Sequence, residues 1–183
     1  RILTAPPRDY QRYAVTESGV SPRALPGGAE FVVVDSDEHT EDGHITEDLE
    51  ARVRMQDKRQ RKLEGMTVEA LAPEQYGRPH GRVLLMCWGS TYGPCREAVD
   101  LINAAGGSAQ MVHFAQLWPL DREVVSARLG LAGRERIISV EGNATGQLPA
   151  LLRLAGIAVE PELLGRYDGL PLLAEEIAAE VLA

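Results

Sequence analysis

Cysteine is scarce in this sequence and long apolar runs are missing, and both absences exclude classes of protein. The only cysteines, Cys87 and Cys95, are not spaced as CxxC, and two thiolates cannot supply the four ligands of an ordinary iron–sulfur cluster. No apolar run approaches the roughly 18 residues of a membrane span, and no signal peptide is recognisable. We therefore expect a cytoplasmic protein whose cysteines are buried thiols.

Basic residues are also in the minority. The net charge of -8 and the pI near 5.1 argue against nucleic-acid partners, whose phosphates call for a basic surface. The 183 residues are enough for one domain with an appendage, or for two small domains. Because the chain begins at Arg1 in a turn-rich segment and without Met, we expect it to be part of a longer protein.

The common catalytic and nucleotide-binding motifs are missing as well. The loop WGSTYG at Trp88 to Gly93 has neither the GxxxxGK[ST] pattern of a phosphate loop nor the GxGxxG pattern of a dinucleotide site. No Gly-x-Ser-x-Gly elbow is present, so Ser90 is not a credible nucleophile. His113 lies in an apolar segment and is expected in the core. A hydrolase or metal enzyme would need a set of groups that the sequence does not supply.

The most informative segment that is present runs from Val83 to Ile102. A continuous apolar run, typical of a strand covered on both faces, is followed by a glycine-rich loop and then by apolar residues at helical spacing. Such a turn directs backbone N–H groups at one point, where an anion or a neighbouring subunit can bind. Ser90, Thr91 and Gly93 are the candidate contacts, although the glycines can equally serve turn geometry alone.

The rest of the second half repeats this pattern. Strands are expected at Ala109 to Phe114 and at Arg136 to Glu141, and helices after Asp121, over Thr145 to Leu154 and from Leu172. Alternating strands and helices predict parallel βαβ units. We therefore expect an α/β fold over residues 81–183, a three-layer α/β/α sandwich with a mostly parallel sheet.

A second group of candidate ligand or interface residues follows the strand that ends at Glu141. Glu141, Asn143, Thr145 and Gly146 lie at a strand's carboxyl end, where α/β sheets generally hold ligands. Asn143 and Thr145 can equally cap the next helix.

The first half has a different character. Residues 1–28 are rich in proline and glycine and predict an extended connector, followed by a short strand at Glu30 to Asp35 and an acidic turn. A long helix is expected from an N-cap at Thr46 to about Leu63, with Gly65 as its stop. Its apolar stripe is thin and its second half is basic, which favours a solvated face over a docking surface. The apolar positions of that stripe are Ile45, Leu49, Val53 and Leu63.

The acidic turn contains the residue types that bind divalent metals. His39 and His44 stand among Asp35, Asp37, Glu38 and Asp42, but no pair has the His-x-x-x-His spacing, so a hydrated turn is the preferred interpretation and no metal is expected. If this half contacts a partner, the candidate interface residues are His39, His44, Arg54, Lys58 and Arg61.

Six segments carry a resemblance to a known family. They resemble, in order, the C-terminal part of the alpha subunit of 2-oxoacid:ferredoxin oxidoreductases, most closely the 2-oxoglutarate type, 2-oxoglutarate synthase. The segments are SPRALPG at 21–27, VDSDEHTEDGHITED at 34–48, RMQDKRQRKLEGM at 54–66, WGSTYGPCREAVDLI at 88–102, HFAQLWPL at 113–120 and VEGNATGQLPALLR at 140–153.

The resemblance implies a part of a thiamine-diphosphate enzyme that converts a 2-oxoacid and CoA to an acyl-CoA and CO₂ and reduces ferredoxin through an iron–sulfur cluster. It implies that residues 1–65 are the tail of a pyrimidine-binding domain and a connecting arm, 66–80 a linker, and 81–183 a domain like the C-terminal domain of transketolase. No segment resembles the family's YPITPS-type substrate loop, its GDG diphosphate motif or its cluster cysteines.

The function implied is therefore an assembly domain with no catalytic residues and no cofactor of its own. Thiamine diphosphate, magnesium and the iron–sulfur cluster would belong to the full complex. The partners of this chain would be the beta subunit and the rest of the alpha subunit, and ferredoxin and CoA would interact with the full complex. A homodimer is a further option. The rival hypothesis is a free-standing module that binds an anionic ligand or peptide through its glycine-rich turns.

Overall fold

The computed structural model describes residues 2–28 and 30–183. The chain divides into two compact units, Arg1–Glu69 and Ala70–Ala183, which are described separately below. No described helix is both long and apolar enough to cross a membrane.

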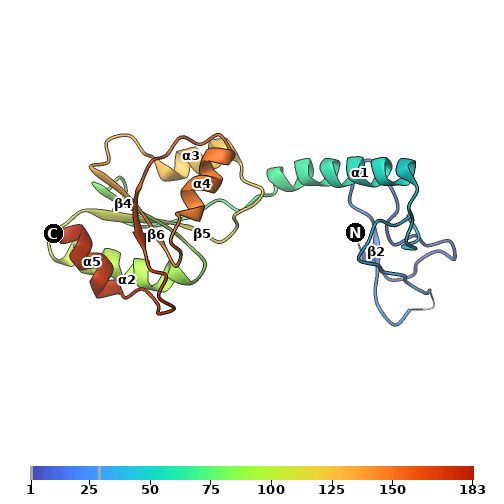
Figure 1. The fold of residues 1–183 in the computed structure, drawn as a ribbon, viewed down its shortest axis with the longest axis horizontal. Coiled ribbons are helices and arrows are strands. Elements are labelled where there is room, and N and C mark those ends of the chain that lie inside the picture. Colours follow the sequence, from blue (N-terminus) through green and yellow to red (C-terminus); the bar gives the residue numbers. More distant parts are fainter. Residues whose placement is uncertain (1, 29) are drawn as a thin grey trace. The chain divides into compact units, whose positions relative to one another are not determined.

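Unit 2, Ala70–Ala183, is built on a five-stranded sheet with the order β3-β5-β4-β6-β7 (Figure 1). Strands β4, β5, β6 and β7 are parallel, and only β3 runs antiparallel, against β5. The register pairs Leu85 of β4 with Met111 of β5 and Ile138 of β6. The strands are β3 (Glu74–Gly77), β4 (Val83–Trp88), β5 (Ala109–Phe114), β6 (Arg136–Glu141) and β7 (Glu162–Gly165).

Helices cover both faces of this sheet. One face packs against α2 (Tyr92–Ala104) and α5 (Ala174–Leu182), and the other against α3 (Arg122–Leu129) and α4 (Gln147–Leu154). Asp121 caps α3 as expected, with its carboxylate accepting from the Val124 N–H at 2.9 Å. The predicted α/β sandwich with a mostly parallel sheet is therefore confirmed.

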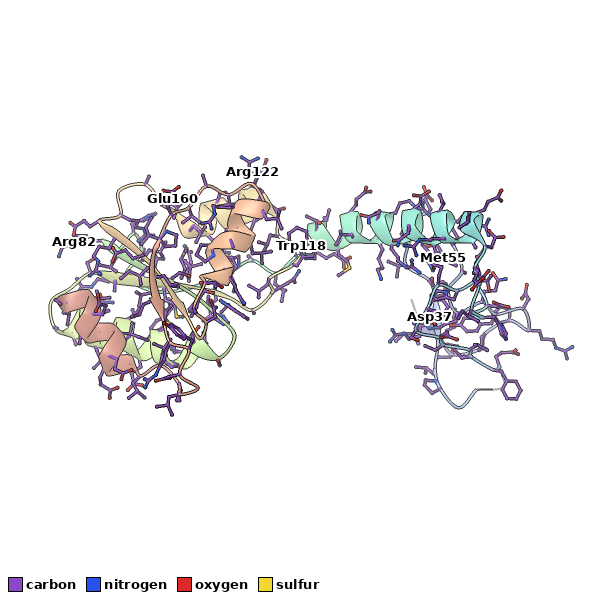
Figure 2. All side chains as sticks on the ribbon, in the orientation of Figure 1. Asp37, Met55, Arg82, Trp118, Arg122 and Glu160 are labelled. Atoms are coloured by element: carbon purple, nitrogen blue, oxygen red, sulfur yellow. The ribbon has the colours of Figure 1, made fainter. Side chains whose placement is uncertain are left out.

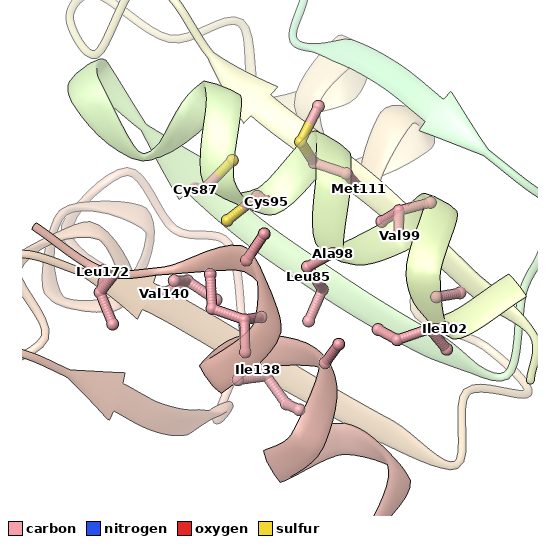
Figure 3. Close-up of a cluster of buried hydrophobic side chains, with 14 residues drawn as sticks. Leu85, Cys87, Cys95, Ala98, Val99, Ile102, Met111, Ile138, Val140 and Leu172 are labelled. Atoms are coloured by element: carbon pink, nitrogen blue, oxygen red, sulfur yellow. The ribbon is translucent and has the colours of Figure 1, made fainter. Parts of the chain in front are cut away.

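Alternate residues of the central strand β4 supply the two cores. Leu85 and Cys87 face α2 and α5 and pack with Val99 and Ile102 (Figure 3), whereas Leu84 and Met86 face α3 and α4. Side chains of successive strand residues point to opposite faces, so a strand buried on both sides must be apolar throughout. Cys87 and Cys95 are both free and fully buried, as expected.

Sequence reasoning missed the two edge strands. β3 lies within residues 66–80, the expected linker, and its sequence EQYG has a single partly buried residue. β7, with the sequence ELLG, is not predicted by the sequence because four residues are too few for a periodicity to be visible. Both strands form because β5 and β6 offer them unpaired backbone groups.

Unit 1 contains one long helix, α1 (Leu49–Val68), which differs at both ends from the predicted helix. Its N-cap is Asp48 and not Thr46, because the Asp48 carboxylate accepts from the N–H groups of Glu50 (2.7 Å) and Ala51 (2.9 Å). Gly65 is not a stop, since the helix continues for three residues beyond it.

The expected strand at Glu30 to Asp35 does not form. Its apolar residues find no neighbouring strand in the described part of unit 1, and Phe31 is 98% exposed. The proline-rich segment instead forms a two-residue parallel pair, β1 (Ile2–Leu3) with β2 (Arg23–Ala24). The acidic turn is closed by an antiparallel bridge between His39 and Ile45.

The buried face of α1 is not the expected apolar stripe. Ala51, Met55 and Lys58 are buried, whereas Leu49 is 78% and Val53 60% exposed. Figure 2 shows Met55 on the side of α1 that faces the N-terminal segments of unit 1. Ile45, Leu49 and Val53 of the predicted stripe are therefore exposed and Leu63 is partly buried, and the connector packs against the opposite face of the helix.

Candidate functional sites

The glycine-rich loops after β4 and β6 meet at the carboxyl edge of the sheet. β4 leads through the 3-10 turn η1 (Gly89–Thr91) to α2 on one face, and its neighbour β6 leads to α4 on the other. Adjacent parallel strands whose connections leave to opposite faces form a topological switch point, where open α/β sheets generally bind ligands. The two groups of residues predicted from the sequence are thus brought together.

Glu141 fills the centre of this edge. It is fully buried, and its carboxylate accepts from the Ser139 hydroxyl (2.7 Å), the Asn143 amide (2.8 Å), the Leu148 N–H and the Trp88 indole N–H (both 3.1 Å). Burial raises the pKa of Glu141, but the hydrogen bonds outweigh burial and hold the pKa below its usual value.

This network affects the anion-binding hypothesis directly. Leu148 is in the first turn of α4, where unpaired N–H groups and the helix dipole favour a negative charge. The Glu141 carboxylate already occupies that position, so a diphosphate or other anion would meet a buried negative charge. At this edge the residues do not fit the diphosphate of a thiamine cofactor.

The remaining residues of the two loops serve the turns themselves. Thr91 is buried and its hydroxyl donates to the Trp88 carbonyl at 2.8 Å, and the Asn143 side-chain oxygen accepts from the N–H groups of Thr145 (3.1 Å) and Gly146 (2.9 Å). Ser90, Gly93 and Thr145 are exposed. Sequence reasoning missed Trp88, whose position at the end of an apolar run gave no sign that its indole joins the two loops.

A basic pocket of about 490 Å³ lies in unit 1. Its walls come from β1, the stretch around Tyr13, the loop from Gly19 to Arg23, His39 and one face of α1. The lining includes both lysines of the whole sequence, Lys58 and Lys62. Its cations are Arg12, Arg23, Lys58, Arg59 and Lys62, and its apolar side chains include Ile2, Val20 and Met55.

Lys58 is the buried cation of this pocket. Its ammonium donates to the Tyr13 carbonyl at 2.5 Å and lies 5.7 Å from the centre of the Tyr13 ring. The pKa of Lys58 is lowered to about 8, chiefly by burial; Glu41 opposes this shift, and the neighbouring cations Lys62, Arg12 and Arg59 add to it. The shift follows mainly from burial, which disfavours the charged form of the ammonium.

The candidate interface residues of unit 1 separate into two groups. His39 is buried and stacks on Tyr13 with ring centres 3.9 Å apart, and Arg61 donates to the Thr16 carbonyl at 3.4 Å. His44 is exposed and bonds to Asp42 at 3.0 Å, and Arg54 is exposed on α1. Among the described residues, no three histidine, cysteine or carboxylate side chains gather as metal ligands.

Comparisons with known proteins show which proteins this chain is similar to. It is 36% identical to 2-oxoacid:ferredoxin oxidoreductase 2, subunit alpha, of Aeropyrum pernix, over 99% of this chain and 28% of that subunit. It is 33% identical to 2-oxoacid:ferredoxin oxidoreductase 1, subunit alpha, of Sulfurisphaera tokodaii, over 97% of this chain and 28% of that one. By sequence, the chain is similar over nearly its whole length to one part of the alpha subunits of 2-oxoacid:ferredoxin oxidoreductases.

One solved structure is similar to this chain as well. The 2-oxoglutarate:ferredoxin oxidoreductase of Magnetococcus marinus, with 2-oxoglutarate, coenzyme A and succinyl-CoA bound, matches 94% of this chain and 30% of its own with a TM-score of 0.74 and 29% identity. No protein-family model matches the chain. Because the chain spans just over a quarter of the alpha subunits that it matches, it corresponds to a part of that subunit.

Proposed function

We propose that this chain is the non-catalytic C-terminal part of the alpha subunit of a thiamine-diphosphate-dependent 2-oxoacid:ferredoxin oxidoreductase, and that it serves assembly. The whole enzyme would convert a 2-oxoacid, CoA and oxidised ferredoxin to an acyl-CoA, CO₂ and reduced ferredoxin. The observation that carries the assembly role is the Glu141 network, which fills the sheet's ligand-binding edge with the chain's own side chains.

The surface of unit 1 supports this role. Leu49 and Val53 expose one face of α1, and Phe31, Val32 and Val34 are exposed in the preceding segment. Large apolar side chains left exposed on a small unit are candidates for contact with other chains. We infer that the rest of the alpha subunit and the beta subunit cover them, and that thiamine diphosphate, magnesium and the iron–sulfur cluster are held by those other parts in a cytoplasmic complex.

Assembly is tested by size exclusion with light scattering, for the chain alone and mixed with the rest of its subunit and the beta subunit. The proposal expects a stable complex, and hydrogen exchange that slows at residues 31–34 and along the exposed face of α1 in that complex. A chain that stays separate, with unchanged exchange, would favour the free-standing module.

Cofactor binding is tested by calorimetric titration with thiamine diphosphate, with and without magnesium. Magnesium-bound diphosphates need oxygen ligands from the protein, so the proposal expects no magnesium-dependent binding to this chain. A saturable signal that strengthens when magnesium is added would show a cofactor site and contradict the proposal.

A further inference from the structure

The basic pocket of unit 1 is not explained by an assembly role. The chain carries a net charge of -8, yet five cationic side chains line this one cavity. Arg59 is neutralised by Glu38, with its guanidinium 2.6 Å and 3.1 Å from the two carboxylate oxygens. Among the described residues, Arg12, Arg23, Lys58 and Lys62 have no carboxylate within ion-pair distance.

One carboxylate nevertheless influences the pocket. Glu41 favours the charged form of Lys58, while its side chain accepts from the Val15 N–H at 2.7 Å. Within the part of the chain that the structure describes, Glu41 forms no ion pair with any of the four cations, so the lining of the pocket keeps a positive excess. A positive excess in a concave site favours binding of an anion with more than one charge.

The walls of the pocket are fixed before any ligand binds. Gly19 packs so closely on α1 that a Cβ there would lie 2.3 Å from the Lys58 carbonyl. The Tyr10 hydroxyl donates to the Pro22 carbonyl at 3.1 Å and accepts from the Ala24 N–H at 2.9 Å, which holds the backbone on both sides of Arg23. Preorganised charges lose less entropy when they bind a ligand.

Size and lining narrow the class of ligand. A cavity of about 490 Å³ is within the range of small-molecule sites and much larger than a free phosphate. Ile2, Val20 and Met55 add an apolar wall beside the cations. We propose that the basic pocket of unit 1 binds an organic phosphate, with its phosphates on the unpaired cations and its organic part on the apolar wall.

ADP, used without magnesium, is a suitable probe because it joins a diphosphate to an organic group. Calorimetric titration of the chain is expected to show saturable binding that weakens as salt rises, because the contacts are ionic. Inorganic phosphate and succinate are expected to bind at least about tenfold more weakly, since each lacks part of what the pocket recognises. Equal binding of ADP and inorganic phosphate would contradict recognition of the organic part.

Two variants on α1 make the test specific to the pocket. Lys62→Gln removes an exposed pocket cation and is expected to weaken ADP binding about tenfold or more. Arg54→Gln removes an exposed cation of the same helix that does not line the pocket, and binding should stay within about twofold. Equal losses in both variants, with circular dichroism unchanged, would show nonspecific attraction and overturn the proposal.

The last experiment repeats the ADP titration with the complete subunit. ADP binding that persists there supports a ligand pocket. Binding to the chain that is lost in the complete subunit would mean that an acidic segment of the same protein fills the cavity, and the proposal would be overturned. The pocket is tested with ADP in the absence of magnesium, whereas the cofactor test asks whether magnesium strengthens the binding of thiamine diphosphate. Failure of one proposal can therefore be distinguished from failure of the other.

Discussion

The carboxylate of Glu141 joins β6, α4 and the end of β4 at one buried point. Its substitution by Gln keeps the shape but turns an amide N–H₂ toward groups that donate hydrogen bonds. We expect Glu141→Gln to lower the free energy of unfolding of unit 2 by about 1–3 kcal/mol at pH 7, measured by urea denaturation. Ser90→Ala, an exposed change in the neighbouring loop, is the control and should stay within about 0.5 kcal/mol.

The pH dependence of that difference follows from the pKa of Glu141. The pKa is lowered in the folded state, so the stabilisation is complete above the unfolded value near 4.5 and is lost as pH falls through the folded pKa. The gap between the parent chain and Glu141→Gln should therefore shrink below about pH 4.5. A gap that stays constant down to acid unfolding would show that the charge of Glu141 contributes nothing.

Leu85 tests the core at the same scale. It is fully buried between α2 and α5, so Leu85→Ala should cost about 2–5 kcal/mol of unfolding free energy in chemical denaturation. Leu154→Ala is a matched control because Leu154 is 78% exposed on α4. A loss below about 0.5 kcal/mol for Leu85→Ala would be incompatible with a central position for β4.

At the scale of elements, the N-cap of α1 is Asp48 in the structure, whereas the sequence predicts Thr46. Asp48→Ala removes two hydrogen bonds to the first turn and should lower the free energy of unfolding of unit 1 by about 1 kcal/mol. The loss is measured as a lower midpoint temperature of thermal unfolding. Thr46→Ala should cost less, because Thr46 only accepts from the Asp48 N–H at 3.1 Å, before the helix begins. A larger loss of stability for Thr46→Ala than for Asp48→Ala would show that Thr46 is the N-cap, as the sequence predicts.

Gly19 tests whether the connector is packed against α1 or merely extended. Gly19→Ala places a Cβ against the α1 backbone at a φ of +74°, whereas Gly27→Ala has a φ of +86° and no atom within 4 Å of the added Cβ. Both changes cost backbone strain, but only the first adds a clash. Faster hydrogen exchange at residues 13–23 in Gly19→Ala alone is expected. Equal effects of the two changes would mean that the connector does not depend on its contact with α1.

The same elements show how far sequence reasoning reached. The bounds predicted for β5 and β6 agree with the structure, because each is a short stretch with adjacent or alternating apolar residues next to a glycine-containing turn. The sequence does not predict β3 and β7, because their formation depends on a neighbouring strand and not on their own residues. The glycine-rich loops were found by composition, but the Trp88–Glu141 hydrogen bond joins residues 53 positions apart, which no local pattern encodes.

For the whole molecule, a well-packed α/β unit and a unit with little regular structure share one chain. Unit 2 has a core on each face of its sheet, whereas unit 1 buries one face of α1 and exposes the other. This exposed apolar surface fits the proposed assembly role, in which other parts of the proposed enzyme would cover it. The basic pocket was not foreseen, because its cations come from three separated segments.

The assembly role is tested most directly by reconstituting the enzyme from separate parts. The rest of the alpha subunit and the beta subunit are mixed with and without this chain, and 2-oxoacid-dependent reduction of ferredoxin is followed. We expect no reduction by this chain alone, little by the other parts without it, and recovery when it is added in equal amount. Ferredoxin reduction by the chain alone, or full activity of the other parts without it, would contradict the account.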